Sequence, residues 1–379
     1  MKTKYLIIGA GISGLTFASY SNGDYLIIEK ESRVGGYCKT TKRNGYVWDY
    51  SGHFFHFKTD DFKKKFIDCL YDLFNKEEKD NYDNFLDMLY GKFGFSIVEK
   101  FLKPYNEKLY AIDLKKLDVD AMGRFFPYAD KEAIINNMKK SSIDSYNSSF
   151  LYPKNGAESF INIIYDELDK NKVLLNTKIV KLNINKKEAE LSNGSIVHYE
   201  YLINTMPLNN FLKLIGNYDE LVNEMSYNKV LVFNLGFDKE SPLCTKEHWL
   251  YIPNKKDNYY RLGFYNNILG SNKLSMYVEI GYSKEAIITE KEISKQLKLT
   301  LKNLEKSKII SKDMKLVDYE SIVMDPAYVH ISTKTNNKID KVKKELSKKN
   351  IYTIGRYGAW IYNSMEDSMV VAKDLAEKI

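Results

Sequence analysis

The sequence predicts a mixed α/β fold, in which a parallel-sheet domain is interrupted by a helical insertion and by a β-sheet subdomain. Three observations support this prediction. A short apolar strand runs into a glycine-rich turn near the N-terminus, another strand near the C-terminus also ends in glycine, and the intervening sequence changes from helical to alternating spacing. A chain of 379 residues is also too long for one small core, so we expect several subdomains.

The first predicted unit is a strand over residues 5–8, a glycine-rich turn and a helix that extends to about residue 20. In this turn Gly9 permits the tight bend, Gly11 lets the backbone approach a pyrophosphate, and Gly14 lets helix and strand pack closely. Ile12 and Ser13 lie at the helix N-terminus, where free N–H groups and the positive end of the helix dipole attract phosphate.

A second strand over residues 25–28 leads directly into Glu29. This carboxylate follows Gly9 by 20 residues, the separation at which an acidic side chain accepts hydrogen bonds from the ribose of a bound dinucleotide. Together, the strand, turn, helix and acid predict a Rossmann-type dinucleotide-binding unit. The alternative is a glycine-rich turn in an α/β core that binds no nucleotide.

The residues after Glu29 resemble an extension found in a large superfamily of FAD enzymes that includes amine oxidases, phytoene desaturases and sugar mutases. This segment contains Lys30, Arg33, Gly35 and Gly36. The resemblance implies that the cofactor is FAD and that these residues lie along its diphosphate and flavin.

A second segment of the same type lies near the C-terminus. A strand over residues 351–354 ends at Gly355 and Arg356, and a helix follows. The resemblance implies that the N-terminus of this helix faces the flavin, with Arg356 and Met365 in contact with the cofactor. We expect the apolar side of the helix to consist of Met369, Val370, Ala372 and Leu375.

We therefore expect a discontinuous FAD-binding domain formed by residues 1–58, 151–225 and 346–379. Residues 59–150 would form a helical domain that binds the substrate and its nucleotide, with a mobile loop near 115–128, and residues 226–345 a β-rich substrate subdomain. Helical spacing continues over residues 131–138, and a hairpin, a turn, a strand and a helix are expected at 180–191, 193–194, 201–205 and 290–306. In the insertion, the apolar residues at helical spacing are Phe62, Phe66, Leu70, Leu73 and Phe74.

Several separated segments resemble the UDP-galactopyranose mutase family, whose members interconvert pyranose and furanose forms of a nucleotide sugar. The segments are SGHFFH at residues 51–56, FLKPYNEKLY at 101–110, DPAY at 325–328 and GRYGAWIY at 355–362. The last is the most specific of the four.

The family resemblance implies a set of site residues. His53 would lie near the flavin, while Arg124 and Arg261 would neutralise the nucleotide diphosphate, because paired arginines offer forked donors to phosphate oxygens. For each arginine the alternative is a surface salt bridge. Phe101 and Tyr105, four apart on one helical face, could hold a uracil between them, although their spacing alone also fits a core stripe. The remaining implied substrate contacts are Tyr110, Tyr146, Tyr328 and Tyr362.

The chain also departs from the family pattern near the expected sugar position. Ile361 replaces an arginine that is common beside the tyrosine, and Asn363 and Ser364 stand where bacterial members have an aspartate nearby. The sugar therefore need not be galactose, and another UDP- or dTDP-hexose fits equally well.

The implied reaction is the ring contraction of a UDP-hexopyranose through an adduct between the sugar and N5 of the reduced flavin. The protein would be an isomerase that needs an external electron donor for the FAD, and galactofuranose-containing polysaccharide biosynthesis is the implied pathway. The runner-up is an FAD-dependent oxidase of the amine or protoporphyrinogen type, and a third interpretation is a non-catalytic protein that binds FAD or a nucleotide sugar.

Composition argues against several other classes of function. No uncharged apolar run of 18 residues occurs, so we expect no membrane span, and the lysines behind the net charge of +7 are spread along the chain rather than gathered for nucleic acid. Cys38, Cys69 and Cys244 are far apart and predict neither a disulfide framework nor a metal site. We expect a cytoplasmic protein; the oligomeric state is open, and a homodimer is compatible with the sequence.

Overall fold

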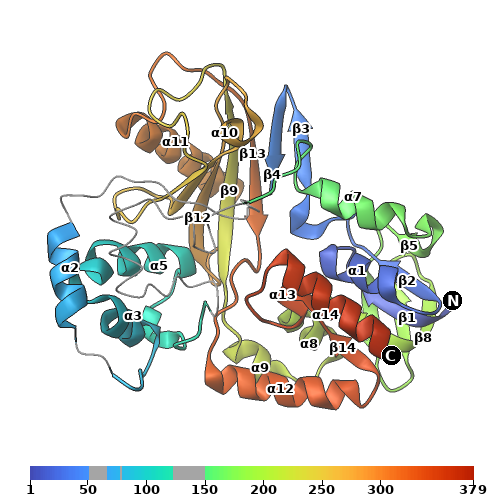
Figure 1. Ribbon diagram of the computed structural model, residues 1–379. Helices are drawn as coiled ribbons and strands as arrows, with labels where there is room; N and C mark the ends of the chain where they lie inside the picture. Colours follow the sequence, from blue (N-terminus) through green and yellow to red (C-terminus); the bar gives the residue numbers. More distant parts are fainter. Residues whose placement is uncertain (51–65, 77–78, 123–149) are drawn as a thin grey trace. The chain divides into compact units, whose positions relative to one another are not determined.

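The computed structural model describes residues 1–50, 66–76, 79–122 and 150–379, and side chains from residue 71 onward in the second of these ranges. The chain divides into two compact units (Figure 1). The first unit contains residues 1–40, 155–226 and 333–379, and the second contains residues 41–154 and 227–332.

The limits of the units differ from the expected domain limits at both ends of the chain. The first segment, expected to end at residue 58, ends at residue 40, because the hairpin of β3 (Thr40–Arg43) and β4 (Tyr46–Asp49) packs on the sheet of the second unit. In this hairpin the Tyr46 hydroxyl donates to the Phe237 carbonyl at 2.6 Å. The last segment of the first unit begins at residue 333 rather than 346, because a helix before residue 346 packs on a strand of the first unit.

The first unit consists of a sheet and the helices around it. Its strands are β1 (Lys2–Ile8), β2 (Tyr25–Ile28), β5 (Val173–Leu174), β6 (Ile179–Asn183), β7 (Glu188–Leu191), β8 (Ile196–Asn204) and β14 (Ile351–Thr353). Its helices are α1 (Ile12–Tyr20), α7 (Glu158–Asp166), α8 (Leu208–Ile215), α9 (Asp219–Glu224), α12 (Thr333–Ser347), α13 (Gly355–Gly358) and α14 (Met365–Lys378).

The sheet of the first unit is mixed, with a parallel core in the order β5-β2-β1-β8. Strand β1 is central: Ile7 pairs with Ile27 of β2 on one side and with Ile203 of β8 on the other. The second half of β8 pairs in parallel with β14, and its first half pairs with β7 in antiparallel orientation. Helices cover a parallel sheet, so its strands are mostly buried and apolar, as β2 is throughout and as β1 is from Tyr5 to Ile8.

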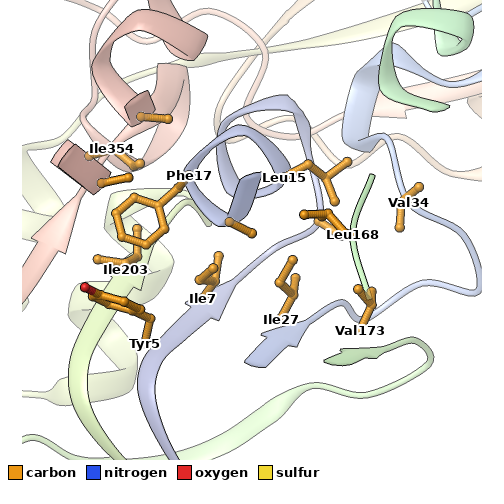
Figure 2. Close-up of a cluster of buried hydrophobic side chains, with 14 of the residues drawn as sticks. Tyr5, Ile7, Leu15, Phe17, Ile27, Val34, Leu168, Val173, Ile203 and Ile354 are labelled. Carbon is orange, nitrogen blue, oxygen red and sulfur yellow. The ribbon is translucent and has the colours of Figure 1, made fainter. Parts of the chain in front are cut away.

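A hydrophobic core joins this sheet to the helix that follows β1. Figure 2 shows Ile7, Ile27 and Ile203 from three adjacent strands together with Leu15 and Phe17 of α1. All five side chains are fully buried. Helix α14 packs against α1, so a helix from the end of the chain lies beside the first helix (Figure 1).

The predicted local structure of the first unit is confirmed apart from the buried face of one helix. The expected hairpin forms as β6 and β7, the turn at Asn193 and Gly194 separates β7 from β8, and the C-terminal helix forms as α14. The prediction for that helix is wrong at Val370, which is half exposed, whereas Ala372 and Ala376 are buried. The small alanines permit the close packing of α14 on α1.

The second unit combines an antiparallel sheet with helices, of which α11 (Glu290–Lys306) is the longest in the described part of the chain. Its strands are β3 (Thr40–Arg43), β4 (Tyr46–Asp49), β9 (Asn228–Phe237), β10 (Trp249–Tyr251), β11 (Arg261–Phe264), β12 (Ser275–Ser283) and β13 (Leu316–Met324). Its helices are α2 (Phe66–Asn75), α3 (Phe85–Phe93), α4 (Phe95–Ile97), α5 (Lys103–Tyr110), α10 (Tyr265–Leu269) and α11 (Glu290–Lys306). Five strands form one sheet in the order β10-β11-β12-β9-β13, and β3 pairs with β4.

Two hydrophobic clusters support this sheet. One contains Leu231 and Phe233 of β9 with Leu304 of α11, the helix predicted over residues 290–306. The other contains Phe85 of α3 and Leu109 of α5. The helical insertion is thus confirmed over its described part, although in α2 Leu73 is buried and Phe74 is half exposed. The expected helix at residues 131–138 lies outside the described residues.

No helix within the described ranges combines the length and the apolar character needed to cross a bilayer.

The burial of the His330 ring predicts that the stability of the protein depends on pH. Its ring is buried, and Nε2 lies 2.9 Å from the Tyr110 carbonyl oxygen, which can only accept, so Nε2 carries hydrogen in the neutral ring. Burial lowers the pKa of His330 to about 4. The unfolded chain takes up this proton near pH 6.5, so stability is full above that pH and falls as the pH decreases towards 4, by about 3 kcal/mol for this residue. Urea unfolding at pH 7.5 and pH 5 measures the loss.

His330→Gln is the matched control, because its side-chain amide can still donate but does not titrate in this range. The difference in unfolding free energy between pH 7.5 and pH 5 should be smaller in this variant than in the wild type. Equal differences in both proteins would contradict the assignment.

Candidate functional site

In the first unit, the segments with glycine-rich motifs meet at the carboxyl edge of the parallel sheet. Gly9 follows β1, Glu29 follows β2 and Thr205 follows β8, while Gly355 comes two residues after β14. Because these strands are parallel, their carboxyl ends lie at one edge of the sheet, the edge where open α/β sheets bind ligands.

Glycine is required at two of the turn positions, Gly14 and Gly355, because neighbouring protein atoms lie too close for a Cβ atom. A Cβ on Gly14 would collide with the Gly9 carbonyl oxygen, and one on Gly355 would collide with the Ser13 hydroxyl, so the C-terminal motif rests on the first turn of α1. Gly9 and Gly355 also have left-handed φ angles of +100° and +78°. A Cβ on Gly11, in contrast, would meet nothing within 4 Å, so this turn is open on the side where a phosphate group would approach.

The second glycine pair lies against the same turn. The Gly35 N–H donates to the Ala10 carbonyl at 2.8 Å, and a Cβ on Gly36 would lie 3.4 Å from the Gly11 Cα. The predicted extension after Glu29 is therefore part of the turn that begins at Gly9.

Glu29 is held in place by the same turn. Its Oε2 accepts from the Ala10 N–H at 2.8 Å and its Oε1 accepts from the Glu31 N–H at 3.0 Å, and the residue is buried. Each carboxylate oxygen can accept a further hydrogen bond, as a ribose hydroxyl would require.

The polar atoms at this edge fit a bound dinucleotide. Among the described residues, no side chain caps the N-terminus of α1, whose N-cap is Gly11, so the first N–H groups of this helix could donate to a phosphate. Two buried side-chain oxygens at the ends of neighbouring strands, Asn204 Oδ1 and Thr353 Oγ1, have no hydrogen-bond partner among the described residues. A buried acceptor or hydroxyl without a partner is costly, so a ligand that supplied one would be stabilised.

The other predicted cofactor residues are engaged with the protein. Arg33 Nη1 donates to the Thr40 carbonyl at 3.1 Å and lies 3.4 Å from the Glu158 carboxylate, while Lys30 is exposed to solvent. Arg33 therefore anchors the loop, and its approach to a diphosphate would require it to leave Glu158.

At the C-terminal motif, Arg356 Nη1 donates to the Asn363 carbonyl at 3.0 Å, and its guanidinium lies 4.2 Å from the ring centre of Tyr362. Met365 begins α14, with its sulfur 3.6 Å from the Cys38 sulfur. The structure thus brings Arg356 and Tyr362 together within the first unit.

In the second unit, Phe101 and Tyr105 lie together but do not form the expected base site. Their rings stack on each other with centroids 5.6 Å apart and planes 6° apart. A base inserted between two rings needs about 7 Å between their planes, two van der Waals separations, so the expected sandwich is wrong in this conformation. Both side chains are partly exposed, and a base could stack on an outer face of the pair.

Tyr110 and Tyr328 also meet, with ring centroids 6.2 Å apart in an edge-to-face arrangement. Tyr110 is buried in the cluster that contains Phe85, whereas Tyr328 is only partly buried at its margin. Tyr110 is therefore a core residue, as the helical spacing alone suggests. Tyr328 is the more accessible of the two tyrosines.

Arg261 lies in a cross-strand row on the second sheet. Strand register places it opposite Tyr251 of β10 on one side and opposite Glu279 of β12 on the other. Arg261 and Glu279 form a two-pronged ion pair, with Nε donating to Oε2 at 2.6 Å and Nη2 to Oε1 at 2.7 Å. The Tyr105 ring packs edge-to-face on Tyr251 at 5.0 Å, so the stacked aromatic pair adjoins this row.

The surroundings of this ion pair are aromatic and dry. Glu279 is 1% exposed, and the Arg261 guanidinium lies 5.9 Å from the ring centre of Tyr277. Burial on its own would lower the pKa of Arg261, but the Glu279 carboxylate outweighs it and holds that pKa well above its usual value. Burial raises the pKa values of Tyr105, Tyr260 and Tyr277 well above 10, so these phenols stay neutral.

Three predicted site residues, His53, Arg124 and Tyr146, lie outside the described residues. Their roles stay predictions of the family resemblance.

A cavity of about 320 Å³ lies elsewhere on the second unit, lined by Lys108, Lys255, Asp257 and neighbours. Burial lowers the pKa of Lys108 to about 8, and its ammonium group donates to the carbonyls of Ile252 at 2.8 Å and Asn254 at 3.1 Å. Lys255 is paired with Glu107 at 2.7 Å. The cationic groups of this cavity are therefore already engaged with protein acceptors.

Sequence reasoning missed Glu279, Tyr251 and Tyr277 around Arg261. Nothing in the linear pattern indicates them, because they become neighbours only through the strand register. Thr205 was also missed, although a strand ending in a hydroxyl residue beside a glycine turn is a usable signal; its Oγ1 donates to the Ile8 carbonyl at 2.7 Å.

Comparisons with known proteins agree with this architecture. Residues 7–70 match the model of the NAD(P)-binding Rossmann-like domain. Over the whole chain the fold is similar to that of a reduced UDP-galactopyranose mutase, with a TM-score of 0.88, 22% identity, and coverage of 100% of this chain and 93% of that one.

Other solved structures are similar at lower scores. A putative protoporphyrinogen oxidase from Exiguobacterium sp. 255-15 has a TM-score of 0.72 at 15% identity and covers 99% of this chain and 98% of its own. A putrescine oxidase has a TM-score of 0.56 at 12% identity and covers 100% and 99%. The α/β fold with a discontinuous Rossmann-type domain, and the resemblance in fold to UDP-galactopyranose mutase, are thereby confirmed.

Proposed function

We propose that this protein is a flavin-dependent nucleotide-sugar mutase, which binds FAD in the first unit and contracts the ring of a UDP-hexopyranose to the furanose. The observation that carries the proposal is the likeness of the whole chain to a reduced UDP-galactopyranose mutase at a TM-score of 0.88, above the 0.72 for the oxidase-type structure. UDP-galactose or a related hexose is the proposed substrate.

The residues of the first unit suit the binding of FAD. The open side of Gly11 and the uncapped start of α1 would receive the diphosphate, and Glu29 would accept from the ribose hydroxyls. When bound and reduced, FAD would supply the nucleophilic chemistry at the anomeric carbon, which fits a mechanism without a protein nucleophile. An external electron donor would keep it reduced.

The residues of the second unit suit the binding of a nucleotide. The partly exposed side chains of Phe101 and Tyr105 would offer a stacking surface for uracil, and the N–H groups of Arg261 that do not bond to Glu279 would donate to phosphate oxygens. Arg124 would add a second cation for the leaving diphosphate. By holding the nucleotide and the departing charge, these residues would favour cleavage of the bond between the sugar and the diphosphate.

The second candidate is an FAD-dependent oxidase of the amine or protoporphyrinogen type, which the fold of the Exiguobacterium and putrescine oxidase structures favours. It would have no use for an arginine beside the stacked rings. A non-catalytic protein that binds FAD or a nucleotide sugar is the third candidate.

The first prediction concerns the reaction itself. Purified protein, reduced with dithionite without oxygen, should interconvert UDP-galactose or another nucleotide hexose with its furanose form, measured by HPLC. Oxidised protein should be inactive and serves as the control. Failure with every nucleotide sugar, together with steady oxygen uptake in the presence of an amine or a porphyrinogen, would favour the oxidase.

The second prediction separates folding from FAD binding. Gly11→Ala should fold with the melting temperature of the FAD-free wild type, because its Cβ meets nothing in the protein, yet should not bind FAD, because the methyl group occupies the approach of the diphosphate. Gly14→Ala should lose stability by several kcal/mol as well as FAD, because its Cβ collides with the Gly9 carbonyl.

Flavin absorbance per protein and thermal denaturation measure the two effects. A Gly11→Ala protein that retains stoichiometric FAD would show that the diphosphate does not bind at this turn.

The third prediction concerns the base. Phe101→Leu keeps most of the apolar volume but removes one ring of the stack, and should weaken UDP binding about 5- to 100-fold, the range of one base–aromatic contact. Phe95→Leu is the control, because Phe95 is exposed and stacks on Tyr90 in the same helical insertion. Isothermal titration calorimetry with UDP should find the control unchanged, and equal affinities for both variants would remove Phe101 from the site.

A further inference from the structure

The hydroxyl of Tyr260 is buried and has no hydrogen-bond partner among the described residues. The backbone of this residue is fixed in the sheet, because its N–H donates to the Glu279 carbonyl at 3.0 Å and its carbonyl accepts from the Ile252 N–H at 2.8 Å. Burial holds the pKa of the phenol well above 10, so the hydroxyl keeps its hydrogen and can both donate and accept. Packing alone gains nothing from this oxygen, since an unpaired buried hydroxyl costs free energy.

Tyr260 lies beside the stacked pair that is proposed to hold the base. Its ring packs edge-to-face on Tyr105, with centroids 6.1 Å apart and planes at 74°. Phe101 lies parallel to Tyr105, with planes 6° apart, so the Tyr260 ring is nearly perpendicular to the planes of the stack. The carbonyl and N–H groups of a base lie in its plane, at its edge. A hydroxyl carried on a perpendicular ring can therefore reach the edge of a base that stacks on Tyr105.

The Tyr260 hydroxyl is covered in this conformation, so a ligand reaches it only if a neighbouring side chain moves. Tyr105 packs on the Tyr260 ring and is itself partly exposed. A rotation of the Tyr105 ring would uncover the hydroxyl from the solvent side. A base that stacks on the rotated ring would then bring its polar edge to the hydroxyl.

We propose that Tyr260 recognises the base of the nucleotide, with its hydroxyl bonded to the N3 and O4 edge of uracil while Tyr105 stacks on the ring of the base. This inference rests on the proposed function and deepens it, because it names a residue that selects the base. Arg261 would act on the phosphates, and Tyr260 on the base alone. The competing interpretation is a hydroxyl that the core only tolerates.

The test removes this one oxygen. Tyr260→Phe should melt at the temperature of the wild type or above it when no nucleotide is present, because the lost hydroxyl has no partner to leave behind. It should bind uridine and UDP more weakly by the same factor, about 5- to 100-fold, since the polar edge of the base then faces an apolar ring. Thermal denaturation and isothermal titration calorimetry measure the two effects.

Two results would overturn the proposal at this stage. A lower melting temperature would show that the hydroxyl bonds to the protein. Unchanged affinity for uridine would show that it does not contact the base, and a loss of UDP affinity alone would place it at the phosphates.

A third ligand locates the contact on the base. The 2-pyridone nucleoside has the ribose of uridine, but carbon replaces N3 and hydrogen replaces O4. The wild type should prefer uridine to this nucleoside, and the preference should fall in Tyr260→Phe by the factor that uridine affinity loses. An equal loss for both nucleosides would place the hydroxyl at the ribose and contradict the assignment to the base.

The matched control is Tyr199→Phe in the first unit, which also removes a buried hydroxyl that has no partner among the described residues. It should keep the wild-type affinities for all three ligands. In turnover of the nucleotide sugar, Tyr260→Phe should raise KM and leave kcat close to the wild-type value, because the base contact is the same in the ground state and the transition state. A fall in kcat at unchanged KM would overturn the proposal.

The outcomes also separate this inference from the proposed function. If the wild type interconverts nucleotide sugars but Tyr260→Phe binds uridine as the wild type does, only the role of Tyr260 is wrong. If the wild type binds neither uridine nor UDP, both are wrong.

Discussion

The first unit depends on one steric constraint, the contact between the backbone of the Gly9 turn and the start of α1. Helix α1 can lie against β1 only because Gly14 lacks a side chain, and the C-terminal motif can rest on α1 only because Gly355 lacks one. These two close contacts bring the carboxyl ends of β1, β8 and β14 to one edge of the sheet, and Glu29 lies beside them. Gly11, in contrast to Gly14 and Gly355, is not in contact with other protein atoms on its Cβ side. A diphosphate would find both space and N–H donors there.

The second unit has a different constraint, because it contains buried charged side chains among aromatic rings. The sheet register places Arg261 between Tyr251 and Glu279, and Tyr105, which stacks on Phe101, packs edge-to-face on Tyr251. The Arg261–Glu279 ion pair is therefore buried beside a group of aromatic rings.

Much of the first unit could be predicted from the sequence, because its signals are local. The turn from Gly9 to Gly14, the following helix and the acid at Glu29 are each specified by a few adjacent residues. The second unit was harder, since its site is made by strand register, which pairs Arg261 with a residue 18 positions away that no motif indicates. The stacking of Phe101 on Tyr105 was also not predictable, since helical spacing shows that two rings are neighbours but not whether space remains between them.

The division of the first unit into three separated segments also has a kinetic consequence. The Thr205 hydroxyl donates to the Ile8 carbonyl across 197 residues of sequence, and β14 joins β8 from a third segment. Contacts at such separation lose loop entropy before they gain stability, which slows folding. Until the last segment arrives, β8 lacks its β14 partner and α1 lacks the cover of α14. During that interval the exposed strand edge and helix face are the surfaces through which chains would aggregate, and a chaperone would most usefully bind there.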